Sequence, residues 1–129
     1  MQETKTKIGD KLILSDLSFQ INGILYQTHN ELGRFAKEKQ YGDLVEKKFE
    51  ENKISYKREL KIGDSGNTMD FNVEDKIALE LKAKPFLLDV DYSQIKRYLR
   101  ASGLELGILV NFREKTLKPR RVLNVRKHL

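Results

Sequence analysis

The chain has 129 residues, 39% of them hydrophobic and 34% charged, which is enough for one folded domain with a modest core. Its net charge of +6 favours an anionic partner, nucleic acid first, although a basic protein with no such partner can carry the same charge. The absence of cysteine excludes disulfides and zinc–thiolate sites. No apolar run approaches the roughly 20 residues of a membrane span, and no apolar signal core opens the chain, so we expect a cytoplasmic protein with no membrane partner.

Residues 1–14 are polar and are predicted to form a flexible N-terminal segment, followed by a single domain over residues 15–129. A first helix is predicted to begin at Ser15 or Asp16, which are both common N-cap residues, and to end at Gly33.

A second helix is predicted from about Glu38 to Asn52, with a buried stripe formed by Tyr41, Leu44, Val45 and Phe49. Glu38 lies on or beside this stripe, where a carboxylate is costly unless it is paired or used. It can equally well serve only to open the helix, because a negative charge suits the helix N-terminus. The local pattern leaves both interpretations open.

Three strands are predicted next, as an antiparallel meander. The first spans residues 54–62, where apolar and polar residues alternate; Arg58 breaks the alternation, as expected at a sheet edge. The turn-forming sequence GDSGN at residues 63–67 leads into a hairpin from Met69 to Ala83. Its apolar residues set the register, pairing Phe71 with Leu79 and Val73 with Ile77, and leave residues 74–76 as the loop.

The same register brings Asp70 opposite Glu80, with Lys82 on the same face as Glu80. Two opposed carboxylates repel each other and destabilise a sheet. A divalent cation between them would remove this repulsion, and a lysine beside them would complete a site for phosphodiester chemistry. The hairpin alone is equally compatible with a solvent-facing polar surface that carries a chance charge pair.

A third helix is predicted from Asp91, as its cap, to Gly103. Gln94 and Tyr98 are four residues apart and therefore share one face of this helix. The residues predicted to point inward are Ile95, Tyr98, Leu99 and Ser102. The cations Lys96, Arg97 and Arg100 lie on the remaining surface, where they form either a solvated face or contacts to phosphates.

The apolar run Leu106–Phe112 is typical of a strand that is covered on both faces, and Val122–Val125 is predicted to form an edge strand. The helix between the hairpin and the apolar run implies a parallel, right-handed crossover. The predicted fold is therefore α/β: a mixed central sheet, made of a three-strand meander plus a crossover helix and parallel strand, flanked by helices.

This order of elements, with Asp70 followed by Glu80-x-Lys82, resembles the core of the PD-(D/E)xK nuclease superfamily, and more closely its GxxExxY family. The matching segments are HNELG (29–33), Glu38 with Tyr41, QIKRYLRASG (94–103) and GILVNF (107–112). The resemblance covers residues from about 15 to 125. It departs from the family at Phe35, which stands where the family name places a glycine; Gly33 matches only an earlier glycine of that loop.

The resemblance implies that Asp70 and Glu80, with the backbone carbonyl of Leu81, bind Mg²⁺ or Mn²⁺, and that Lys82 orients or activates the attacking water. Glu38 would support the metal site. Gln94 and Tyr98 would contact the site or the nucleic-acid backbone, and the cations expected to contact nucleic acid are Lys96, Arg97 and Arg100.

The expected function is that of a metal-dependent nuclease that hydrolyses phosphodiester bonds in nucleic acid, with DNA as the expected substrate. The alternative is a catalytically weak or inactive nucleic-acid-binding or accessory module of the same fold. A purely structural partner of another protein is a third option. The sequence leaves a homodimer open.

Overall fold

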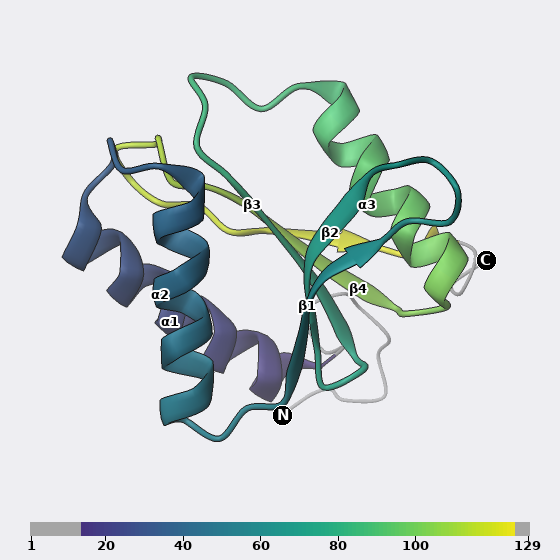
Figure 1. Cartoon of the computed structure of the whole chain (residues 1–129), viewed down its shortest axis with the longest axis horizontal. Helices are drawn as coiled ribbons and strands as arrows, with labels where there is room; N and C mark the ends of the chain where they lie inside the picture. The colour runs from purple at the N-terminus through teal and green to yellow at the C-terminus, as the bar shows by residue number, and fades with distance from the viewer. Residues whose placement is uncertain (1–13, 126–129) are drawn as a thin grey trace, which may run out of the picture.

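The computed structural model describes residues 14–125 (Figure 1). Almost all of the predicted flexible segment, residues 1–14, lies outside this range. The elements are, in order, α1 (Ser15–Leu32), α2 (Glu38–Glu51), β1 (Tyr56–Lys61), β2 (Thr68–Val73), β3 (Ile77–Lys82), α3 (Asp89–Ser102), β4 (Leu106–Asn111) and β5 (Arg120–Leu123). Within the described residues, no helix is both long and apolar enough to cross a membrane.

The five strands form one mixed sheet in the order β1-β2-β3-β4-β5. The β3–β4 pair is parallel and the other pairs are antiparallel. Helices α1 and α2 pack on one face of the sheet and α3 on the other, as Figure 1 shows. The predicted α/β class, the meander and the parallel crossover through a helix are confirmed, and β4 is buried along its whole length, as a strand covered on both faces must be.

The core has two parts, one on each face of the sheet. The larger part joins α1 and α2 to the sheet and includes the fully buried Tyr41 and Phe71. The smaller part lies under α3, where Ile95 packs against the backbone of Gly107. A Cβ atom at Gly107 would lie 2.6 Å from Ile95 Cδ1, so the missing side chain lets α3 lie directly on β4.

The hairpin has the register that its apolar residues predict. Phe71 pairs with Leu79 and Val73 pairs with Ile77. The three-residue loop between the strands is also as predicted, with positive φ angles at Glu74 and Asp75. Register and loop follow from alternation alone, because a slip by one residue would turn every apolar side chain of the hairpin to the other face.

Helix α1 begins at Ser15, as predicted, but three details at the helix ends differ from the predictions. Leu14, with φ 54°, precedes the first turn of α1, so the N-cap is Leu14 and neither Ser15 nor Asp16. Helix α3 begins two residues before Asp91, whose carboxylate accepts a hydrogen bond from the Leu88 N–H at 2.7 Å and so caps the helix from within its first turn. Ser102, which is predicted to point inward, is exposed.

Candidate active site at the end of the hairpin ladder

Both backbone ladders of β2 are interrupted at the same residue, Asp70. On the β1 side, Arg58 pairs with Phe71 and Leu60 with Met69, but the pair between them is missing. Glu59, which would face Asp70 there, has a positive φ of 57°. On the β3 side, ladder pairing ends at Phe71 and Leu79, one step before Asp70. The chain therefore opens a gap in the sheet at the residue that the sequence places opposite Glu80.

The two carboxylates fill this gap by accepting hydrogen bonds from the unpaired backbone. Asp70 Oδ2 accepts a hydrogen bond from the Leu81 N–H at 2.7 Å. Glu80 Oε1 accepts one from the Asp70 N–H at 3.1 Å. Backbone donors that lose their ladder partners must be satisfied elsewhere, and here the side chains of the site do it. The predicted proximity of Asp70 and Glu80 is therefore present.

Lys82 lies at the centre of a group of polar side chains from β3 and α3. Its Nζ is 3.1 Å from Glu80 Oε2 and 3.7 Å from Asp91 Oδ1. It also donates a hydrogen bond to Gln94 Oε1 at 3.4 Å, and Gln94 Nε2 donates to the carbonyl of Thr68 at 3.4 Å. The structure thus brings Glu80, Lys82 and Gln94 together, Glu80 and Lys82 as alternation in β3 predicts and Gln94 as the family resemblance implies.

Asp91 and Lys84 belong to the same group, and the sequence pattern does not assign them to it. Asp91 is 3% exposed, and its Oδ2 is 2.9 Å from Lys84 Nζ. Two signals were available: Lys84 is two residues after Lys82, and Asp91 is one helical turn before Gln94. The direction of the Lys84 side chain does not follow from the sequence, because Pro85 comes directly after Lys84 and ends the alternating strand pattern.

Burial raises the pKa of both carboxyl groups in the gap. Burial, followed by the charge of Asp70, raises the pKa of Glu80 above its ordinary value. Burial also raises the pKa of Asp70, although the Leu81 N–H and Glu80 partly oppose the rise. Burial would lower the pKa of Lys82, but the negative charges of Glu80, Glu38 and Asp91 outweigh it and raise that pKa. Lys82 is consequently a cation at neutral pH, and a positive charge beside the carboxylates is built into the site.

Glu38, the first residue of α2, faces the same gap from the other side. The residue as a whole is exposed, yet its carboxylate is partly shielded from water, and this shielding, followed by the charge of Asp70, raises its pKa. The Ala83 N–H donates a hydrogen bond to it. Glu38 therefore lies at the start of α2 and also faces the charged group, while its support of a metal site stays a prediction.

A cavity of about 230 Å³ lies between α2 and the gap in the sheet. Arg58 lines it and contributes a guanidinium group that is 2.7 Å from Glu46 and 2.9 Å from Asp43. The sequence pattern predicts only an edge position for this arginine, and β1 is indeed an edge strand. The lining residues are Glu38, Lys39, Gly42, Arg58, Glu59, Asp70, Phe71 and Leu81.

The remaining predicted site residues, all on α3, lie apart from the gap. Tyr98 is only 6% exposed, and its hydroxyl accepts a hydrogen bond from Asn72 Nδ2 at 3.3 Å, so its side chain is part of the core under α3. Lys96, Arg97 and Arg100 are exposed, as predicted for a cationic surface. Tyr98 and Gln94 share a face of α3, but only Gln94 reaches Lys82.

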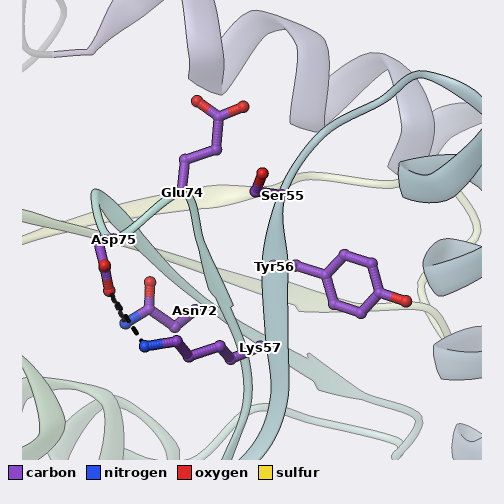
Figure 2. Close-up of a pocket in the computed structure, with 6 residues that line it drawn as sticks. All are labelled: Ser55, Tyr56, Lys57, Asn72, Glu74 and Asp75. Carbon is purple, nitrogen blue, oxygen red and sulfur yellow. Dashed lines mark hydrogen bonds and ion pairs between the residues drawn. The ribbon is translucent and has the colours of Figure 1, made fainter.

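A larger hollow of about 450 Å³ lies at the opposite end of the hairpin, near its loop. Figure 2 shows Asn72 and Lys57 both directed at Asp75, which accepts a hydrogen bond from Asn72 at 3.3 Å and lies 4.0 Å from Lys57. Glu74 points away from this cluster (Figure 2). None of the residues predicted to carry chemistry lines this hollow, so the smaller cavity at Asp70 is the candidate active site.

The gap supplies only a few carboxylate oxygens. This suits an ion such as Mg²⁺, which keeps several water ligands, better than an ion that takes all of its ligands from the protein. Among residues 14–125, no group of three or more histidine, aspartate or glutamate side chains is placed to hold a metal. Asp70 and Glu80 do supply adjacent, partly repelling carboxylates. Mg²⁺ is usually held in this way, by one or two carboxylates together with water and substrate phosphates.

Comparison with known proteins agrees with this geometry. The family model of the PD-(D/E)XK nuclease superfamily matches residues 15–122, which include every helix and nearly every strand of the fold. Neither the curated proteins nor the solved structures gave a match. The matched range contains the sheet, the interrupted ladder and all of the charged side chains described above. The chain therefore belongs to the PD-(D/E)XK nuclease superfamily.

Proposed function

We propose that this nuclease-like protein is a metal-dependent nuclease of the GxxExxY group, and that it hydrolyses phosphodiester bonds in nucleic acid, with DNA as the expected substrate. The single observation that carries the proposal is the pair of carboxylates, Asp70 and Glu80, in a gap of the sheet with the cationic Lys82 at 3.1 Å from Glu80. The sheet loses ladder hydrogen bonds at this gap, and two carboxyl groups are buried side by side in it. Both features cost stability, and such features cluster at functional sites.

Nucleases of this superfamily generally use divalent metal ions. Asp70 and Glu80, with the backbone carbonyl of Leu81, are the residues that would hold Mg²⁺ or Mn²⁺ here. A bound divalent ion would polarise a phosphoryl oxygen and lower the pKa of a water molecule. A positive ion would also favour the charged form of Glu80, whose pKa is raised first by burial and then by the charge of Asp70.

Lys82 acts in this proposal as a fixed cation and not as a base, because its raised pKa keeps it protonated. It would orient the attacking water and stabilise the charge that develops on the phosphate in the transition state. Gln94 would position it by accepting its hydrogen bond at 3.4 Å. Glu38 would support the site from α2.

The exposed cations Lys96, Arg97 and Arg100 would contact phosphates further along the substrate. Such contacts are electrostatic and independent of sequence, so they should weaken as salt is added. Tyr98 has no part in this interface, because its ring is buried and its hydroxyl is hydrogen-bonded to Asn72.

The decisive test is hydrolysis of single-stranded and double-stranded DNA in Mg²⁺ or Mn²⁺ by wild type, Asp70→Ala and Lys82→Ala. Each substitution should reduce the rate by about 100-fold or more, as expected for loss of a charged group from a preorganised site. Asp64→Ala, in the exposed turn between β1 and β2, is the matched control and should leave the rate unchanged. Hydrolysis that survives both site substitutions would contradict the assignment.

Metal binding can be measured separately by calorimetric titration of Mn²⁺ into wild type and Glu80→Gln. Binding that is lost in the variant supports the carboxylate pair as ligands. Unchanged binding, or salt-dependent DNA binding without cleavage that Asp70→Ala does not alter, would instead favour a nucleic-acid-binding module of the same fold.

A further inference from the structure

An exposed phenylalanine between two arginines lies beside the candidate active site. Phe35, in the loop between α1 and α2, is 73% exposed. The guanidinium carbon of Arg34 lies 4.8 Å from the centroid of its ring, and that of Arg113 lies 5.6 Å from it. An exposed aromatic ring that lies beside two arginines contributes little to the core, so a role in binding is the better explanation of its position.

The loop that carries Phe35 is held in place on both sides of the ring. The hydroxyl of Tyr41 donates a hydrogen bond to the carbonyl of Gly33 and accepts one from the Ala36 N–H at 3.2 Å. Tyr41 is itself fully buried and stacked on Phe112, with 4.1 Å between the ring centroids. The ring of Phe35 is therefore presented by a rigid loop, which lowers the entropy cost of binding to it.

The arginines connect this loop to the strand that carries Lys82. Arg34 Nε donates to the carbonyl of Arg113 at 2.8 Å, and Arg113 Nη2 donates to the carbonyl of Ala83 at 3.3 Å. Ala83 directly follows Lys82, and its N–H donates to Glu38. The residue Ala83 thus contacts the arginine group through its carbonyl and the candidate active site through its N–H.

The charge of this group is suited to a polyanion. Within the described part of the chain, neither Arg34 nor Arg113 forms an ion pair with a carboxylate, and the buried Nε of Arg113 has no hydrogen-bond partner. Two guanidinium groups without a carboxylate partner, beside an aromatic ring that is 73% exposed, match a nucleotide, which offers a flat base next to a phosphate.

We propose that Phe35 stacks on an unpaired nucleobase of the substrate while Arg34 and Arg113 contact the adjacent phosphates, so that the protein prefers single-stranded or locally unpaired nucleic acid. The inference rests on the proposed nuclease function and adds the form of the substrate. A base inside a duplex already stacks on its neighbours and cannot offer its face to Phe35. Unpaired bases do so readily, and stacking on an aromatic side chain is tolerant of sequence.

The chain contains no tryptophan, which allows a direct optical test. Phe35→Trp places a single tryptophan at the proposed stacking position. Phe19→Trp is the matched control, because Phe19 is 79% exposed on α1 and no arginine lies over its ring within the described residues. Titration with a single-stranded oligonucleotide without divalent metal should strongly quench the tryptophan fluorescence of Phe35→Trp and leave that of Phe19→Trp nearly unchanged.

Affinity gives the second readout, again without metal so that no cleavage is needed. Phe35→Ala should weaken binding of the single strand by about 10-fold, the loss expected from one base stack, and Phe35→Tyr should restore it. Affinity for a duplex of the same sequence should change less than about two-fold, since phosphate contacts dominate there. Because Phe35 is exposed, both variants should retain the wild-type melting temperature.

The outcomes separate this inference from the proposed function. Cleavage that depends on Asp70, combined with wild-type single-strand affinity in Phe35→Ala, overturns the role of Phe35 and leaves the nuclease assignment intact. Quenching of the Phe35→Trp variant by a single strand, in a protein that cuts nothing, supports the stacking role and overturns the nuclease assignment. Equal quenching by duplex and single strand overturns the preference for unpaired bases. No binding of either form without metal overturns the role of Phe35, while hydrolysis in Mg²⁺ or Mn²⁺ decides the nuclease assignment.

Discussion

Glu80 Oε1 accepts a hydrogen bond from the backbone N–H of Asp70 at 3.1 Å, across the point where β2 and β3 stop pairing. The second carboxylate of the site thus holds the backbone of the residue that supplies the first. Asp70 Oδ2 in turn accepts the N–H of Leu81, the neighbour of Glu80. Each carboxylate thus satisfies a backbone N–H beside the other, so variants at either position should be compared with isosteric amides as well as with alanine.

Glu80→Gln should stabilise the metal-free protein, and the gain should grow with pH. The amide keeps an oxygen for the Asp70 N–H but carries no charge. Burial raises the pKa of Glu80 in the folded state above its unfolded value, so the folded wild type binds more protons. Its stability is therefore greatest at low pH and falls as the pH rises through the folded-state pKa. Melting temperatures of both proteins, measured across the acid-to-neutral range, check this.

The two melting curves should converge in acid, where Glu80 is protonated, and separate by several degrees at and above neutral pH; about 1 kcal/mol corresponds to roughly 4 °C for a domain of this size. Adding Mn²⁺ should raise the melting temperature of wild type but not of Glu80→Gln. A variant that is less stable than wild type at every pH would show that Glu80 is not under electrostatic strain.

Gln94→Ala should slow hydrolysis without removing substrate binding. Gln94 contacts Lys82 Nζ at 3.4 Å, so its loss frees the lysine to adopt other rotamers. We expect kcat to fall by about 10-fold, while KM changes little, because only the alignment of the cation in the transition state is affected. Ser93→Ala, at the adjacent exposed position of α3, is the control. A rise in KM at constant kcat would instead make Gln94 a substrate-binding residue.

Gly42→Ala should change the free energy of unfolding differently in the presence and in the absence of Arg58. A Cβ atom at Gly42 would lie 2.5 Å from Arg58 Nη2, so alanine must displace the guanidinium from Glu46. In an Arg58→Ala background this conflict is absent, and alanine in a helix should add about 1 kcal/mol to the free energy of unfolding. With Arg58 present the gain should be smaller or reversed. Urea denaturation of the four proteins measures the coupling, and additive effects would show that Arg58 does not depend on Gly42.

Glu59→Gly should stabilise the fold by about 1 kcal/mol, because a positive φ strains every residue with a side chain but not glycine. Lys61→Gly, in the same exposed edge strand but without a positive φ, is the control and should destabilise it. If both substitutions destabilise the fold equally, the positive φ of Glu59 does not strain β1 where the ladder is interrupted at Asp70.

The sequence by itself determined the order of the elements, the hairpin register and the proximity of the Asp70, Glu80 and Lys82 side chains. These follow from periodicity: alternation assigns each strand residue to a face, and the apolar residues leave one register that buries them. The position of Gln94 near the site is implied by the family resemblance, whereas periodicity establishes only that Gln94 shares a helix face with Tyr98.

Only the tertiary structure decided how deep each side chain lies and what it meets. Periodicity gave Tyr98 a face but not the hydrogen bond from Asn72 that keeps it in the core. It could not bring Lys84 to Asp91, or Arg34 and Arg113 to Phe35, because these contacts join loops whose paths depend on how the layers pack. The gap at Asp70 likewise depends on three strands together, because the β1–β2 ladder skips Asp70 and the β2–β3 ladder ends one residue short of it.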